Sequence, residues 1–164
     1  MKDLDQFLVP YVISQAVAIG FLLAAWKNTK LARLLFALLF VAASAFNMYL
    51  GLTSPDTYII IYAKTAVPLY RNFINGWFSH CNHIIIPVIA TGQFAIGVGM
   101  LLKGWWVRWA CIGAIIFLLS IAPLMTGSAF PFSLIVLWAA WLVLKNDKKC
   151  YLWQSTKHRL SYSI

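Results

Sequence analysis

Long apolar runs, interrupted by short polar or charged breaks, dominate the pattern of this chain. A run of about 20 apolar residues is long enough to cross the roughly 30 Å hydrocarbon core of a bilayer as a helix. The sequence therefore predicts an all-α polytopic membrane protein, a single membrane domain over residues 1–164, with five transmembrane helices that form a four-helix core plus an N-terminal helix. The predicted spans are residues 8–26, 31–52, 84–102, 106–125 and 129–144. The last span is the shortest, and Lys145 can extend it by snorkelling toward the headgroups.

Residues 53–83 differ in pattern from the spans on either side. Ser54 is a favoured helix cap and Pro55 suits the first helical position, so a helix is expected to begin here. Pro68 is expected to break the segment in two. Aromatic and apolar residues then recur at the spacing i, i+3, i+4, i+7 and i+8, namely Tyr70, Phe73, Ile74, Trp77 and Phe78. This periodicity predicts that residues 55–79 form an outer amphipathic segment lying at the membrane interface.

Composition agrees with this pattern and excludes an ordinary soluble domain. The chain is 62% hydrophobic and 10% charged, whereas soluble domains carry roughly a quarter charged residues. Its formal net charge is +9. In a membrane protein such a basic excess is first explained by topology and by anionic headgroups, so no nucleic-acid partner is expected. No Glu is present, and none of the four acids falls inside a predicted span: Asp3, Asp5, Asp56 and Asp147.

The basic residues are distributed unevenly between the two sides of the five predicted spans. One side holds ten of the 13 Lys and Arg residues: Lys27, Lys30, Arg33, Lys103, Arg108, Lys145, Lys148, Lys149, Lys157 and Arg159. Because Lys and Arg concentrate on the cytoplasmic side, we expect the N-terminus outside and the C-terminus in the cytoplasm, with a basic tail at residues 145–164. The first span is expected to be retained, since acids rather than a basic region flank it.

The order of features along the chain points to a family. A span is followed by the outer segment SPDTYIIIYAKTAVPLYRNFINGWF and then by three closely spaced spans, the first of which reads IPVIATGQFAIGVGMLLKG. Over residues 31–144 this order resembles the DoxX-like family of small bacterial membrane proteins. The resemblance implies a multi-pass protein of the bacterial inner membrane, a subunit or accessory protein linked to redox chemistry, with a quinone as a possible cofactor. That family includes a thiosulfate:quinone oxidoreductase subunit.

A more distant likeness is to the emopamil-binding type of four-helix membrane bundle. Such bundles enclose sterol-like ligands and include isomerases, whose proton carriers are intramembrane acids. No predicted span of this chain contains an acid, so catalysis of that kind lacks its usual carrier. A thiol-disulfide enzyme is also disfavoured, because the three cysteines, Cys81, Cys111 and Cys150, fall at different depths and no C-x-x-C is present.

Two histidines offer weak candidates for metal binding or proton transfer. His80 and His83 lie three residues apart, so they would share one face of a helix. A zinc or haem site needs further ligands. Apart from the N-terminal Asp3 and Asp5, the sequence offers only Asp56 as an acid on the same predicted side, and His158 falls on the other side. We therefore expect no metal, and the plainer interpretation is a polar lip at the outer interface.

Six other residues are candidates for binding the polar end of a hydrophobic small molecule. Polar groups inside a span are costly and suggest function; here Asn47 and Gln93 lie near the outer ends of their spans. Lys64 and Arg71 would share a helix face if Pro68 only kinks the segment. The candidates are Asn47, Tyr58, Tyr62, Lys64, Arg71 and Gln93. The alternatives are hydrogen bonding between helices for the amides and a solvated or lipid-facing pair for the two cations.

Three functional hypotheses follow. The first is a non-catalytic subunit or binding protein that holds a quinone or lipid beneath the outer segment. The second is a membrane enzyme of isomerase or oxidoreductase type that uses His80 or His83 for proton transfer. The third is a structural scaffold with protein partners in a larger membrane complex. Membrane lipids are expected to surround the protein in each case.

Overall fold

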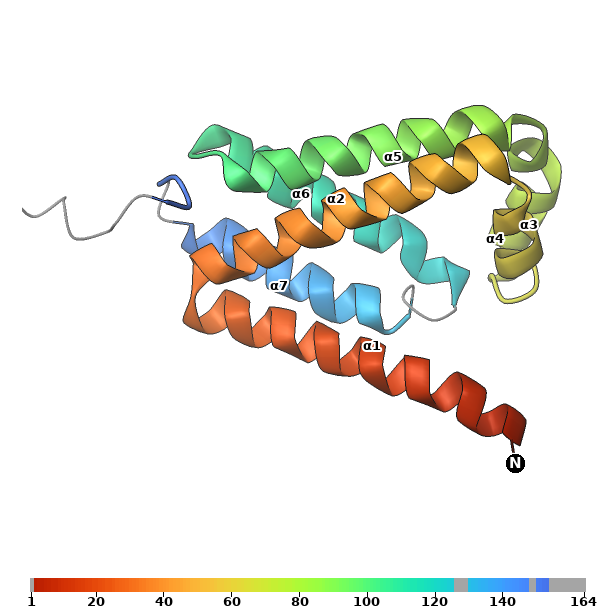
Figure 1. Cartoon of the computed structure of the whole chain (residues 1–164), viewed down its shortest axis with the longest axis horizontal. Helices are drawn as coiled ribbons and strands as arrows, with labels where there is room; N and C mark the ends of the chain where they lie inside the picture. The colour runs from red at the N-terminus through yellow and green to blue at the C-terminus, as the bar shows by residue number, and fades with distance from the viewer. Residues whose placement is uncertain (1, 126–129, 148–149, 154–164) are drawn as a thin grey trace, which may run out of the picture.

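The computed structural model describes residues 2–125, 130–147 and 150–153, and every regular element within them is a helix (Figure 1). The chain begins with α1 (Lys2–Lys27) and α2 (Thr29–Thr53), which diverge from a tight turn at Asn28. The Asn28 side chain caps α2, because its Oδ1 accepts hydrogen bonds from the backbone N–H groups of Lys30 (3.1 Å) and Leu31 (3.2 Å). The first two predicted spans therefore coincide with two separate helices.

The remaining long helices are α5 (Ser79–Leu101), α6 (Trp105–Ile121) and α7 (Phe132–Asn146). A short turn, η2 (Ala122–Leu124), follows α6. The chain reverses between α5 and α6 at Gly104, whose φ of +60° is a conformation that favours glycine. The predicted all-helical class is thus confirmed.

Three helical stretches within the described residues are long and apolar enough to cross a membrane: Thr29–Thr53, Pro68–Leu101 and Trp105–Leu124. Two further apolar helices, Tyr11–Lys27 and Phe132–Asn146, are shorter. The second stretch starts well before the predicted span at residue 84, because the chain runs from Pro68 into α5 with only a kink at Gly76, whose φ of −93° and ψ of −108° are not helical. These features are those of a helical membrane protein.

Helix α2 packs along α5, whereas α7 lies between α1 and α6 (Figure 1). Glycine makes the α2–α5 contact close. A Cβ added at Gly97 would lie 2.8 Å from Val41 Cγ2 and 3.2 Å from the Ala37 carbonyl oxygen. On the opposite face of α5, a Cβ added at Gly99 would lie 2.8 Å from Ala110 Cβ of α6. Small residues of this kind let membrane helices approach each other closely.

A row of phenylalanines connects three helices through the core. Phe21 of α1 and Phe36 of α2 pack edge to face with ring centroids 5.0 Å apart, and Phe40 of α2 meets Phe117 of α6 in the same way at 5.7 Å. Phe36 and Phe40 are themselves stacked at 6.5 Å. Aromatic pairs in these arrangements add to the gain from burial.

The outer segment forms α3 (Thr57–Tyr62), α4 (Pro68–Phe73) and a wide turn, η1 (Ile74–Phe78), at one end of the α2–α5 pair (Figure 1). The segment is divided in two, and Pro68 is the first residue of the second piece, as predicted. Two hydrogen bonds tie the connection between the pieces to η2: Val67 N–H donates to the Pro123 carbonyl (3.1 Å), and Thr65 Oγ1 donates to the Leu124 carbonyl (3.0 Å).

The expectation that Ser54 caps a helix is wrong. Ser54 ends α2 instead, since its backbone N–H donates to the Leu50 carbonyl (2.8 Å), and its own carbonyl accepts from Thr57 N–H (3.1 Å). The second span continues to Thr53, so Ser54 and Pro55 form the turn into α3.

Candidate ligand-binding site

Three of the predicted ligand-binding side chains form one hydrogen-bonded chain at the outer end of the bundle. The Tyr58 hydroxyl donates to Asn47 Oδ1 (2.5 Å), and Asn47 Nδ2 donates to Gln93 Oε1 (2.7 Å). Gln93 is 2% exposed. These hydrogen bonds therefore join α3, α2 and α5. Both the oxygen and the nitrogen of the Asn47 side chain are hydrogen-bonded within the protein. The geometry is that of hydrogen bonding between helices, the alternative that the sequence left open.

Tyr62 lies beside this chain, with its ring stacked on that of Tyr58 at a centroid distance of 6.0 Å. Burial, with a smaller contribution from the neighbouring Tyr62, raises the pKa of Tyr58 to about 12. Burial also raises the pKa of Tyr62 above its ordinary value. Both phenols therefore keep their protons across the physiological range, and Tyr58 remains a hydrogen-bond donor to Asn47.

A second pair of polar contacts fastens the same region. Asn82, only 4% exposed, donates from Nδ2 to Asp56 Oδ1 at 2.8 Å, which joins the start of α3 to α5. Deeper in the bundle the Ser44 hydroxyl of α2 donates to the Ala90 carbonyl of α5 at 2.7 Å. The outer segment is thus held to the bundle by hydrogen bonds as well as by apolar contact.

Lys64 and Arg71 do not share a helix face. The chain leaves the helical conformation between α3 and α4, where Val67 has a ψ of 152° before Pro68, as residues before proline prefer. Arg71 instead reaches back and donates from Nη2 to the carbonyls of Lys64 (3.3 Å) and Ala66 (3.4 Å). Both cationic side chains are exposed.

His80 and His83 lie in the first turns of α5, and both are exposed. His80 Nδ1 lies 2.8 Å from the Gly76 carbonyl oxygen and 3.3 Å from Ser79 Oγ. Within the part of the chain that the structure describes, no group of three or more His, Cys, Asp or Glu residues is placed to hold a metal ion. The arrangement around His80 is that of a hydrogen-bonded turn at the start of a helix.

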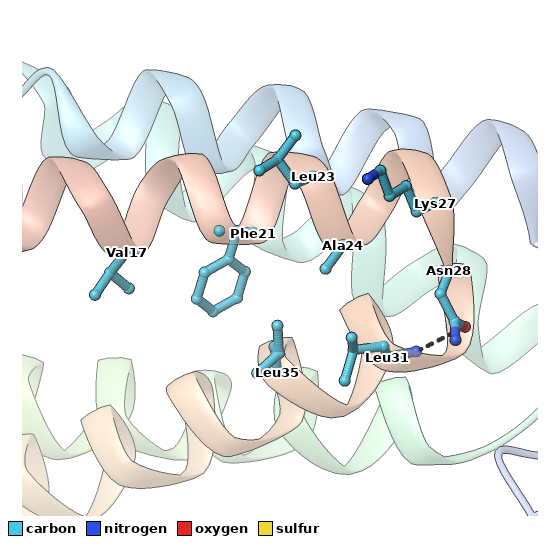
Figure 2. A pocket seen from close by; sticks show the side chains of 9 residues that line it. Val17, Phe21, Leu23, Ala24, Lys27, Asn28, Leu31 and Leu35 are labelled. Carbon is cyan, nitrogen blue, oxygen red and sulfur yellow. Dashed lines mark hydrogen bonds between the residues drawn. The ribbon is translucent and has the colours of Figure 1, made fainter.

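A groove of about 520 Å³ lies between α1 and α2, at the end where the two helices meet (Figure 2). Val17 and Phe21 of α1 point toward α2, and Leu31 and Leu35 of α2 point toward α1 across the open space. Aliphatic and aromatic side chains, two polar ones and one glycine line it: Val17, Gly20, Phe21, Leu23, Ala24, Lys27, Asn28, Leu31 and Leu35. None of the ligand-binding residues predicted from the sequence lines the groove. The groove arises because two helices diverge, and local sequence patterns do not show such a divergence.

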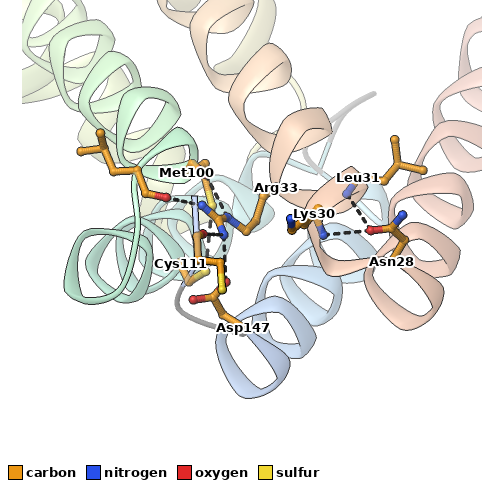
Figure 3. Close-up of polar contacts among 9 residues, drawn as sticks. Asn28, Lys30, Leu31, Arg33, Met100, Cys111 and Asp147 are labelled. Atoms are coloured by element: carbon orange, nitrogen blue, oxygen red, sulfur yellow. Dashed lines mark hydrogen bonds and ion pairs between the residues drawn. The ribbon is translucent and has the colours of Figure 1, made fainter. Parts of the chain in front are cut away.

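A buried ionic cluster lies at the same end of the bundle (Figure 3). The Arg33 guanidinium, 1% exposed, pairs through Nη1 with Asp147 Oδ1 at 3.0 Å. It also donates to three carbonyls: Met100 (3.0 Å), Cys150 (2.8 Å) and Leu102. Arg33 therefore ties α2 to the end of α5 and to the chain after α7.

From the sequence, Arg33 is expected only as one of the basic residues on the cytoplasmic side. The sequence did contain a signal for the buried pair. An ionisable residue within an apolar run is a candidate functional residue and is usually paired with an opposite charge. Asp147 is the sole acid on the same predicted side. The bonds to backbone carbonyls had no such signal, since any residue supplies a carbonyl.

Comparison of the chain with protein-family models, with curated proteins and with solved structures gives no match. The fold and the geometry of its sites therefore carry the functional argument, and the resemblance to DoxX-like proteins stays an expectation from the sequence.

Proposed function

We propose that the protein is a non-catalytic, five-span integral membrane protein that binds a hydrophobic small molecule, a lipid or a quinone, in the groove between α1 and α2. One observation carries the proposal: the groove is open on one side, mostly apolar and about 520 Å³ in volume. Ligand sites in proteins range from roughly 300 to 1,000 Å³ and share that apolar character. In this proposal the shorter helices α1 and α7 cross the membrane beside the three longer stretches.

The proposal moves the ligand away from the outer polar residues. Asn47, Tyr58 and Gln93 are engaged with one another, so a ligand would have to break two hydrogen bonds to gain its own. Buried donors and acceptors that are already paired gain little from exchanging partners. In this proposal Asn47, Tyr58 and Gln93 hold the outer end of the bundle together. The groove, by contrast, offers apolar surface that no other part of the described protein covers.

The proposed setting is the bacterial inner membrane, with the N-terminus outside. The groove then opens near the cytoplasmic leaflet, where a quinone or a lipid can enter sideways from the bilayer. A link to membrane redox processes, as the DoxX-like resemblance implies, requires a quinone in the groove or a redox partner protein, since the chain has no C-x-x-C.

Native mass spectrometry of the gently solubilised protein, combined with organic extraction, tests the proposal. Gly20→Leu is the blocking variant, because a Cβ added at Gly20 meets no neighbouring side chain or other helix within 4 Å among the described residues. The larger side chain can therefore enter the groove without disturbing the fold. Gly92→Leu is the matched control, since Gly92 has the same free space on α5, away from the groove.

The wild type and Gly92→Leu are expected to retain the same lipid or quinone, and Gly20→Leu is expected to lose it. The proposal fails if the wild type is consistently empty, or if Gly20→Leu retains as much ligand as Gly92→Leu. Circular dichroism of each variant checks that the helical content is unchanged.

A further inference from the structure

A lysine lies at the rim of one end of the groove, and the length of the groove matches one leaflet of a bilayer. Its lining on α1 extends from Val17 to Lys27, which is about 15 Å along a helix that rises about 1.5 Å per residue. The hydrocarbon core of a bilayer is roughly 30 Å thick, so one leaflet supplies about 15 Å of acyl chain. A groove of this length accommodates one leaflet's tail alongside α1.

Lys27, in the last turn of α1, is the one cation among the lining residues, and because the groove surface is apolar its ammonium lies at the rim. Lys27 is exposed, and the chain turns back at Asn28, which also lines this end. A turn between two membrane helices lies at headgroup depth, and a lysine there attracts anionic headgroups. Apolar residues line the opposite end, near Val17 and Gly20.

The charges around the groove are compatible with an anion at this end. No acid is among the lining residues. The described acid at the same end of the bundle, Asp147, is paired with the buried Arg33. No carboxylate of the lining therefore neutralises Lys27, and an uncharged quinone would make no use of its charge.

The lining suits a hydrocarbon chain. The groove surface offers no polar atom, so an occupant gains from burying apolar surface there. An acyl chain is narrower than a helix and needs no hydrogen-bond partner from the lining.

We infer that the groove holds an acyl chain of an anionic glycerophospholipid whose phosphate pairs with the Lys27 ammonium. This inference rests on the proposed function and specifies its ligand. In this inference Lys27 favours lipids with an anionic headgroup. The apolar lining accepts the acyl chain, and the absence of a side chain at Gly20 leaves room for it.

The experiment is a lipid titration of the purified full-length protein, followed by native mass spectrometry. The probes are a phosphatidylglycerol and a phosphatidylcholine with identical acyl chains. The variants are Lys27→Gln, Lys27→Arg and Gly20→Leu. The matched control is Lys103→Gln, which removes one exposed lysine from the turn between α5 and α6, outside the groove lining.

The wild type is expected to bind phosphatidylglycerol more tightly than phosphatidylcholine. Lys27→Gln is expected to weaken phosphatidylglycerol binding about fivefold, the effect of one lysine at a membrane surface, and to leave phosphatidylcholine binding unchanged. Lys27→Arg keeps the charge and should bind as the wild type does, as should Lys103→Gln. Gly20→Leu is expected to weaken binding of both lipids.

The outcomes separate the inference from the proposed function. If the wild type binds both lipids equally and Lys27→Gln changes neither, the headgroup assignment is overturned, while a loss in Gly20→Leu still supports a hydrophobic ligand. Retention of a quinone in place of phospholipid overturns the inference and leaves the proposed function standing. If Gly20→Leu binds both lipids like the wild type, or releases a protein subunit instead, both are overturned.

Discussion

Arg33 and Asp147 form a buried ion pair, 3.0 Å long, between side chains that are 1% and 4% exposed. The two residues are 114 positions apart, and the pair joins α2 to the residue that follows α7. A buried charge is tolerable only when it is paired and hydrogen-bonded. Here the guanidinium also donates to three carbonyls, so it supplies partners to groups at the end of α5.

Removing the Arg33 side chain is expected to destabilise the protein strongly. Arg33→Met removes the guanidinium that pairs with Asp147 and donates to three carbonyls, and breaking a buried pair costs about 3–5 kcal/mol. Unfolding in mixed micelles, followed by circular dichroism, measures the change. Arg108→Met, which removes an exposed arginine of α6, should change stability by less than about 0.5 kcal/mol.

Arg33→Met combined with Asp147→Asn should recover part of that loss, because the buried side chain that paired with Arg33 is then neutral. If Arg33→Met alone is as stable as Arg108→Met, the ion pair has no role in holding the helices together.

Tyr58 and Asn47 are expected to be energetically coupled. Tyr58→Phe removes the donor to Asn47 Oδ1, and leaving a partly buried acceptor unpaired costs about 1–3 kcal/mol. In a double-mutant cycle with Asn47→Ala, the coupling energy should be at least about 0.5 kcal/mol, as for residues in one hydrogen-bonded network. Tyr49→Phe is the control, since Tyr49 is exposed. Additive effects of Tyr58→Phe and Asn47→Ala would show that the contact contributes nothing to stability.

Alkaline pH should weaken the attachment of the outer segment. Folding raises the pKa of Tyr58 from 10.0 to about 12, so the unfolded chain loses its phenol proton first. The contribution of Tyr58 to stability is therefore fully present below pH 10 and is lost as the pH rises through about 12. The melting temperature of the wild type should fall more steeply over this interval than that of Tyr58→Phe. Equal slopes for the two proteins would contradict the prediction.

The proposed orientation can be checked through the cysteines. In intact cells a thiol reagent that cannot cross membranes should modify Cys81, which is partly exposed at the start of α5. Cys150 should react only after the cells are permeabilised. Cys111 is buried in α6, so it should react in neither case before unfolding. Modification of Cys150 from outside would mean that the orientation is inverted.

Several features of the fold were accessible from local patterns. The apolar runs predicted the helices α2, α5 and α6, because the length and hydrophobicity of a run are properties of consecutive residues. Pro68 predicted the division of the outer segment for the same reason, since proline acts on its own backbone. The proximity of Asn47, Tyr58 and Gln93 followed from their expected depths in neighbouring helices, although their pairing with one another was only one of two alternatives.

Other expectations depended on details that local patterns do not carry. Ser54 has the chemistry of a helix cap, yet α2 extends to the residue before it and turns it into the end of that helix. Lys64 and Arg71 have helical spacing, yet the tie between Val67 and Pro123 holds the chain open between them. In both cases the outcome was decided by where a neighbouring helix ends.

The sequence by itself determined that this chain is helical and apolar enough for a membrane, because hydrophobic runs specify helices one segment at a time. Only the tertiary structure decided which polar groups meet and where a groove opens. Arg33 finds Asp147 and three carbonyls because α2, α5 and α7 converge at one end of the bundle. The groove exists because α1 packs along α7 whereas α2 packs along α5. Helices α1 and α2 therefore diverge and leave apolar surface uncovered between them.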